Sequence, residues 1–371
     1  MLSFSDEFEK RRNKVNSVIK SLQAKEDKNI LQAIYSVSNI QDNHYDEDKL
    51  NKVNRTFFTD MPMKELLSHF KKENFNNKGA KYYEELFQEI YNRQAKDNGY
   101  EPRYLVEVSG DAATTNGFMR HGTNMLNINA GMIEKYKKVD EFTDNADRKN
   151  ATTIGAHSLL TLVHETQHTF QSEGIMKFAL GEDDENLHDK RRNAICLARM
   201  SLSNYLHYNG DMNNEDDKKI YDLLRNTYWF DYMEHDSNMA PVKFLNKHIK
   251  NGNITDEVFI KAGKQRAVND IHINKVTDQS EIPSTLQERA EKMEEVIQGY
   301  YKYFKEKMKD GKIKDQVCEV LEGYLKADSE GKSEFNKDIT KDFDMCLKFM
   351  GINKKISRKA EDKNQEELAN I

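Results

Sequence analysis

The stretch SLLTLVHETQHTFQS, residues 158–172, stands out because Glu165 is its only charged residue. In the whole chain of 371 residues, 32% of the residues are charged. A run of this length without surface charges predicts a buried helix that carries one acidic residue. A carboxylate inside such a helix is costly unless it has a partner or a chemical task. The stretch therefore marks Glu165 and its neighbours as candidate functional residues.

The two histidines beside Glu165 have the spacing of a metal site. A helix turns once in about 3.6 residues, so His164 and His168 lie one above the other on the same face. Two imidazoles at this spacing can share one tetrahedral ion, the geometry typical of zinc. Glu165 points about 100° away from His164, where it can take a proton from water whose pKa the metal lowers to ~7. The pattern predicts zinc ligands at His164 and His168 and a general base at Glu165. The alternative is a surface helix on which two histidines are neighbours by chance.

Short strands are expected directly before this helix. Residues 104–109 alternate in the manner of a strand and end at Ser109-Gly110. Residues 117–120 and 125–129 are two further strand-like runs, and HGTN at 121–124 has the composition of a turn. We therefore expect a hairpin and one small sheet.

The surroundings of the motif resemble those of zincin metallopeptidases, in which uncharged residues flank H-E-x-x-H and a hydrophobic residue closes it. Here residues 161–163 precede the motif, Thr166 and Gln167 are uncharged, and Phe170 follows. The resemblance implies a zincin-like core, in which an edge strand above the cleft pairs with extended substrate and precedes the motif helix. Met125–Asn129 matches that strand by position and alternation, and an ordinary hairpin strand is an equal alternative.

The resemblance also points to a third zinc ligand. The metzincin pattern would need Gly at position 171 and His at 174, and this chain has Gln171 and Gly174. The aspzincin pattern GTxxDxxYG is absent too. In several gluzincin families a glutamate ligand on a second helix is followed four residues later by Asp or Asn after a small residue. Glu234-x-x-Ser237-Asn238 resembles that arrangement, which implies Glu234 as the ligand and Asn238 as a residue that orients it.

Several other residues are candidates for parts of this site. The third ligand has alternatives in Asp236, His188, His207 and His235, and Glu234 itself has the alternative of a surface carboxylate. Gluzincins often use a Tyr or His to stabilise the oxyanion, which here leaves Tyr228, Tyr232 and His235. His157 lies seven residues before His164, on roughly the same helix face, and we expect a first-turn polar residue there rather than a ligand.

Composition excludes several classes of protein. The formal net charge is −6 and charges of both signs are mixed along the chain, which argues against a dedicated nucleic-acid binder. No apolar run approaches the ~18 residues that would span a bilayer, and the N-terminus does not resemble a signal peptide. The three cysteines, Cys196, Cys318 and Cys346, show no paired spacing. We expect a cytoplasmic protein with reduced cysteines, with export by a signal-free route left open.

These observations predict an α+β protein that is predominantly helical, with a zincin-like core and a small sheet packed on the motif helix. The expected organisation is a helical region (1–99), a metal-binding catalytic domain (100–270), a second helical region (271–352) and a charged tail (353–371). Further helices are expected at 8–22, 63–70, 82–91, 284–308 with Ser284 as N-cap, 315–325 and 335–350.

The expected function is that of a zinc-dependent metallopeptidase of gluzincin type that acts on peptides or proteins, without a membrane or nucleic-acid partner. The alternatives are an inactive zincin-fold binding or scaffold protein, and a zinc hydrolase of a non-peptide bond.

Overall fold

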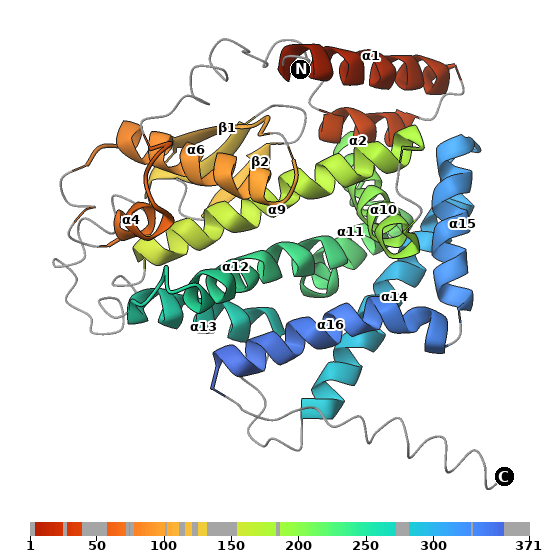
Figure 1. Cartoon of the computed structure of the whole chain (residues 1–371). Coiled ribbons are helices and arrows are strands. Elements are labelled where there is room, and N and C mark those ends of the chain that lie inside the picture. Colours follow the sequence, from red (N-terminus) through yellow and green to blue (C-terminus); the bar gives the residue numbers. More distant parts are fainter. Residues whose placement is uncertain are drawn as a thin grey trace, which may run out of the picture.

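The computed structural model describes residues 4–24, 28–38, 58–71, 74, 78–100, 102–110, 116–120, 125–131, 154–182, 186–271, 282–327 and 329–351. In these residues the chain is predominantly helical and contains one small sheet (Figure 1). The expected α+β class with helices in the majority is thereby confirmed. The expected tail, residues 353–371, lies outside the described residues.

The helices expected from apolar spacing are all present. The helical elements of the described residues are α1 (Phe4–Gln23), α2 (Lys28–Ser38), α4 (Met63–Ser68), α6 (Ala80–Asp97), α9 (Ile154–Leu180), α10 (Leu187–Asn209), α11 (Glu215–Asn226), the 3-10 turn η2 (Tyr228–Phe230), α12 (Tyr232–Lys250), α13 (Glu257–Ile271), α14 (Ile282–Lys307), α15 (Lys312–Lys326) and α16 (Ser329–Phe349). One boundary prediction is wrong, because Ser284 lies inside α14 rather than at its N-cap. The helix begins earlier since Pro283, which fixes a helical φ and needs no N–H partner, suits a first turn.

The sheet has three strands in the order β1-β3-β2: β1 (Leu105–Ser109), β3 (Met125–Asn129) and β2 (Gly117–Arg120). β3 pairs in parallel with β1 and antiparallel with β2, so that Arg120 is opposite Met125. The antiparallel pair has the pairing of the expected hairpin, and its turn at 121–124 lies outside the described residues.

The prediction that Met125–Asn129 is an edge strand is wrong. This strand is the middle one, and β2 is at the edge of the described sheet. Leu126 and Ile128 alternate with Asn127 and Asn129, and all four side chains are buried, as in a strand that is covered on both faces. Asn127 is satisfied from the neighbouring strand, because its Nδ2 donates to Ser109 Oγ at 2.8 Å. A buried asparagine that bonds across the sheet is compatible with a central strand.

The motif helix α9 is buried along almost the whole of the uncharged stretch. Every residue from 158 to 172 is buried except Gln167, which is half-buried. This confirms the predicted buried helix, and the alternative of a surface helix is wrong. α9 packs against β2 and β3, against α6 and α10, and above all against α12. No helix among the described residues is long and apolar enough to cross a membrane.

Buried apolar side chains form two large cores, and α9 and α12 belong to both. The first core lies mainly among α1, α2, α10, α14 and α15 and includes Ile175 of α9 and Met233 of α12. The second lies among α4, α6, the sheet and α13 and includes Leu159 of α9 and Phe244 of α12. Figure 1 shows the two helices running past each other near the centre of the molecule. The motif helix is therefore fixed by apolar packing toward both of its ends.

Gly174 provides a test of the contact between α9 and α10. A Cβ at this position would lie 2.3 Å from Oδ1 of Asn193, a residue that is itself buried. We expect Gly174→Ala to lower the free energy of unfolding, because overpacking costs about 1–3 kcal/mol and outweighs the ~1 kcal/mol that alanine gains in a helix. Gly323→Ala in α15 is the matched control, since nothing lies within 4 Å of its added Cβ. Urea denaturation should show a lower free energy of unfolding in Gly174→Ala and a slightly higher one in Gly323→Ala. Equal gains in both would contradict the packing of these two helices.

Candidate metal centre

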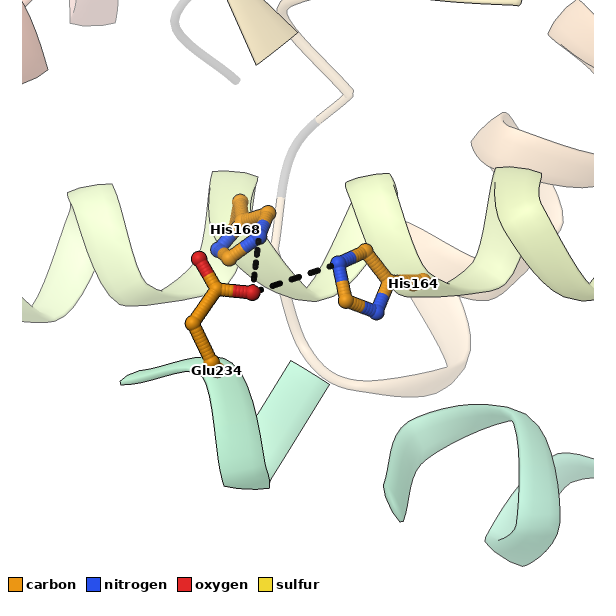
Figure 2. Close-up of side chains that lie close together, drawn as sticks. All are labelled: His164, His168 and Glu234. Atoms are coloured by element: carbon orange, nitrogen blue, oxygen red, sulfur yellow. Dashed lines mark ion pairs between the residues drawn. The ribbon is translucent and has the colours of Figure 1, made fainter. Parts of the chain in front are cut away.

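Three of the predicted site residues converge at the contact between α9 and α12. Figure 2 shows His164 and His168 on α9 facing the carboxylate of Glu234, which comes from the first turn of α12. Glu234 Oε2 lies 3.8 Å from His164 Nε2 and 3.9 Å from His168 Nε2. Among the described residues, these form the one group of three His, Cys, Asp or Glu side chains whose ligand atoms all lie within 4.8 Å of one another.

The three atoms are of the types that zinc binds in proteins. Donor atoms about 2.0–2.1 Å from a tetrahedral zinc are roughly 3.3–3.4 Å apart, so the two distances from Glu234 Oε2 to the imidazoles exceed that spacing by about 0.5 Å. The same distances are too long for hydrogen bonds. Glu234 Oε2 is in fact buried without a hydrogen-bond partner among the described residues. A buried carboxylate oxygen without a partner is costly, and a cation at this point would satisfy it.

Glu234 is positioned by the cap of α12. Asp231 is the N-cap residue and accepts a hydrogen bond from the backbone N–H of Met233 at 3.0 Å. Arg199 of α10 forms an ion pair with the buried Asp231 carboxylate. Since the N-terminal end of a helix attracts negative charge, the first turn of α12 also suits the Glu234 carboxylate.

Two side chains contact the His168 imidazole at Nδ1, the ring nitrogen opposite the one that faces Glu234. His168 Nδ1 lies 2.8 Å from Gln171 Oε1 and 3.0 Å from Ser237 Oγ. Gln171 in turn donates to the backbone carbonyl of Met233 at 2.8 Å. One residue on α9 and one on α12 thus contact the same imidazole nitrogen, which is the arrangement expected around a metal-binding histidine.

The pKa values of the two histidines are shifted in opposite directions. Burial, followed by the charges of His168 and Arg266, holds the pKa of His164 well below 6.5. Burial also acts to lower the pKa of His168, but Glu234 and Glu165 outweigh it and raise the value. The environment of His164 therefore favours the neutral imidazole, the form that binds a metal.

Glu165 lies beside the group of three and is not part of it. Burial is the largest influence on its carboxyl and, with the negative charge of Glu234, raises its pKa to about 7. His168, Arg266 and the backbone N–H of Met119 act in the opposite direction. A carboxyl group with a pKa near neutrality can both accept and return a proton, which is what a general base requires.

Of the three residues considered for the oxyanion, only Tyr228 faces this site. Burial and then its interaction with Glu234 raise the pKa of the Tyr228 hydroxyl, and Glu165 adds to the shift. Tyr232 is buried. Burial and then the charge of Asp236 raise the pKa of its hydroxyl, and Arg192 acts in the opposite direction. His235 Nε2 lies 3.1 Å from Asp342 Oδ2. The structure thus makes a distinction that the sequence left open.

Two of the alternative candidates for the third ligand, Asp236 and His188, interact with residues outside the group of three. Asp236 accepts hydrogen bonds from Gln167 at 2.7 Å and from Gln171 at 3.1 Å. His188 Nε2 lies 2.9 Å from Asp338 Oδ2. The side chain of His207 lies outside the described residues.

Two further polar residues near the motif were considered from the sequence. His157 is hydrogen-bonded to Gln265 at 3.0 Å and does not belong to the group of three. Asn238, which was expected to orient Glu234, lies beside the His164 imidazole and acts to raise its pKa.

Two residues near the site were missed from the sequence. Gln171 lies one turn beyond His168 on the same helix, so helical spacing could have identified it. Arg266 belongs to α13, where its Nη2 donates to Thr161 Oγ1 at 3.0 Å, and its charge acts on both His164 and Glu165. Nothing in the local sequence of α13 indicates that contact.

Comparison with known proteins gives no match to a protein-family model, to a curated protein or to a solved structure. The site is therefore interpreted from its own geometry and chemistry.

Asp342 lies against His235, the residue that follows Glu234. The contribution of this contact to stability can be tested through its dependence on pH. Burial alone would raise the pKa of Asp342, but the hydrogen bond with His235 and the charge of Lys243 outweigh burial and lower it. A lowered carboxyl pKa stabilises the folded state above the ordinary value of about 3.9, and this contribution is lost as the pH falls through the folded-state value. We expect Asp342→Asn to reduce the free energy of unfolding by about 1–3 kcal/mol at neutral pH.

The difference in the free energy of unfolding between Asp342→Asn and the parent chain should become smaller below pH ~4. It is measured by urea denaturation in the presence of a chelator. Asp344→Asn, two residues further along α16, is the control, because Asp344 Oδ1 is buried without a hydrogen-bond partner among the described residues. A pH-independent difference for Asp342→Asn would contradict the stabilising ion pair.

Proposed function

We propose that this chain is a zinc-dependent metallohydrolase, and specifically a metallopeptidase with a zincin-like core of gluzincin type. The observation that carries the proposal is the convergence of His164, His168 and Glu234, whose buried Oε2 has no hydrogen-bond partner in the part of the chain that the structure describes. The buried Glu165 beside them, with its raised pKa, supplies the second part of the chemistry.

In the proposed reaction His164, His168 and Glu234 would hold the ion. Zinc in such a site supplies Lewis-acid chemistry, which lowers the pKa of a water molecule and polarises a carbonyl group. The Glu165 carboxylate accepts the proton of the attacking water and returns it to the amine that leaves. Tyr228, whose hydroxyl interacts with Glu234, would donate its O–H to the oxyanion.

The edge of the sheet supports a peptide as substrate. The N–H of Asn129 donates to the carbonyl of Asn116 at 3.0 Å, so alternate residues of β2 direct their backbone groups to β3 and the others direct theirs away from it. Gly117 and Met119 belong to the second set, and the N–H of Met119 faces Glu165. An extended peptide could add to this edge as a further strand and pass beside the site. β2 thus takes the role that the sequence suggested for Met125–Asn129.

Glu165→Gln tests the proposed general base. We expect zinc to remain bound, because Glu165 is not a ligand, while turnover falls by about 10²–10⁴-fold, the range for removal of a general base. Zinc content is measured by elemental analysis and turnover with a broad peptide library. A parent protein with zinc stoichiometry near zero would rule the function out. Zinc-loaded protein that is inert on peptides would favour the scaffold, and cleavage of a non-peptide bond alone would favour the other hydrolase.

Glu234→Ala tests the third ligand. The variant should lose zinc while His188→Ala, which changes a histidine outside the group of three, should keep it. Equilibrium dialysis against zinc at a fixed chelator concentration gives both affinities. Equal affinities in the two variants would show that Glu234 is not a ligand.

Tyr228→Phe tests the proposed oxyanion donor. Removing one such donor typically lowers kcat by about 10²–10³-fold, and we expect that loss with zinc content unchanged. Steady-state kinetics and elemental analysis are measured on the same preparation. Loss of zinc instead of kcat would mean that the hydroxyl supports Glu234 and does not act on substrate.

A further inference from the structure

The amide of Gln171 is in contact with both helices that form the metal centre. Gln171 is buried on α9, one turn after His168. Its Oε1 lies 2.8 Å from His168 Nδ1, and its Nε2 lies 2.8 Å from the backbone carbonyl oxygen of Met233 on α12. Met233 directly precedes Glu234 in the chain. One amide group therefore lies between a histidine of the site and the backbone next to its carboxylate.

The orientation of this amide is fixed by its partners on α12. A backbone carbonyl can only accept a hydrogen bond, so the group that faces Met233 must be the NH₂. Asp236 Oδ2, 3.1 Å from the same nitrogen, is also an acceptor when it is ionised. The amide oxygen must consequently face His168.

The orientation of the amide determines which nitrogen of His168 carries the proton. Oε1 of Gln171 can only accept, so Nδ1 of His168 must be the N–H that donates to it. In a neutral imidazole the other nitrogen is then an acceptor. That nitrogen is Nε2, the atom that faces Glu234 Oε2. When His168 is neutral, the lone pair of Nε2 is therefore directed into the proposed metal centre before any ion binds.

We propose that Gln171 is a positioning residue that selects the Nδ1–H tautomer of His168 and thereby prepares Nε2 as a metal ligand. The proposal rests on the metal centre proposed above. Gln171 also links this ligand to the backbone beside Glu234, because the two halves of its amide bond to different helices. The extended metzincin pattern has glycine at this position, and here a side chain with both an acceptor and a donor occupies it.

Ser237 is the competing partner. Its Oγ lies 3.0 Å from His168 Nδ1 and 3.2 Å from Gln171 Nε2. A hydroxyl can rotate to donate or accept, so Ser237 by itself accommodates either tautomer. Only the amide, whose orientation Met233 fixes, discriminates between them.

The chain offers a matched control at Gln167. Gln167 lies one turn before Gln171 on the same helix and donates to the same Asp236 Oδ2, at 2.7 Å. Its amide has no hydrogen bond with His168 among the described residues. Gln171→Met and Gln167→Met therefore both remove an amide that binds Asp236, and only the first removes the acceptor for Nδ1–H.

The test measures the tautomer and the affinity separately. In full-length, metal-free protein with ¹⁵N-labelled histidine, the signals of His168 are assigned by their absence in His168→Asn. At a pH high enough for His168 to be neutral, we expect the Nδ1–H tautomer in the parent chain and in Gln167→Met, and its loss in Gln171→Met. Zinc titration against a competing chelator should show affinity about 10–100-fold weaker in Gln171→Met, the usual effect of removing the partner of a ligating histidine, and within twofold of the parent in Gln167→Met.

Gln171→Glu is a second variant, which is used if Gln171→Met does not fold. It retains an acceptor for Nδ1–H and should therefore keep the Nδ1–H tautomer of His168. Loss of the tautomer in Gln171→Glu, or identical tautomers and affinities in Gln171→Met and Gln167→Met, would overturn the proposal. A tautomer that changes in Ser237→Ala and not in Gln171→Met would assign the role to the serine and overturn it as well. A parent chain that binds no zinc would refute the proposed function, while the tautomer would still be read in the metal-free protein.

Discussion

The contact between α9 and α12 is the constraint on which the site depends. The two helices pack closely because each carries apolar side chains of both large cores. That packing brings Glu234 to within 4 Å of two imidazoles on the neighbouring helix. Apolar burial, which contributes roughly 25 cal/mol for each Å² removed from water, thus provides the free energy that holds a carboxylate in a poorly solvated place. The polar cluster is sustained by the packing around it.

The electrostatics of the cluster follow from this burial. His164, Glu165, His168 and Glu234 share a volume in which charges are poorly solvated, so neighbouring charges act strongly on the pKa values of His164, Glu165 and His168. Glu234 acts to raise the pKa of Glu165, while His168 acts to lower it. Burial is the largest influence on both His164 and Glu165, and it favours the neutral form of each. Groups whose pKa values are pushed away from their ordinary range are typical of sites that transfer protons.

Local patterns predicted the parts of this molecule that local rules govern. The spacing of His164 and His168 on one helix face needs only the geometry of that helix, and the lack of charge around them was enough to predict burial. Glu234 required a resemblance, because it lies 66 positions after His168 and no periodicity extends over that distance. The middle position of β3 could not be seen either. That position depends on which strands pair, and the hydrogen bond from Asn127 to Ser109 lies across the sheet rather than along the chain.

Gln171 and Arg266 differ in how far their contacts can be predicted from the sequence. Gln171 lies three residues from His168 on one helix, so its contact with the imidazole follows from helical geometry once the ligand is known. Its second contact, with Met233, depends on how α9 and α12 are aligned, and no pattern in either segment specifies that alignment. Arg266 depends wholly on such tertiary packing, since α13 brings it to Thr161 from more than a hundred positions away. Because Gln171 needs both kinds of information, its role becomes visible only when the motif and the helix opposite it are considered together.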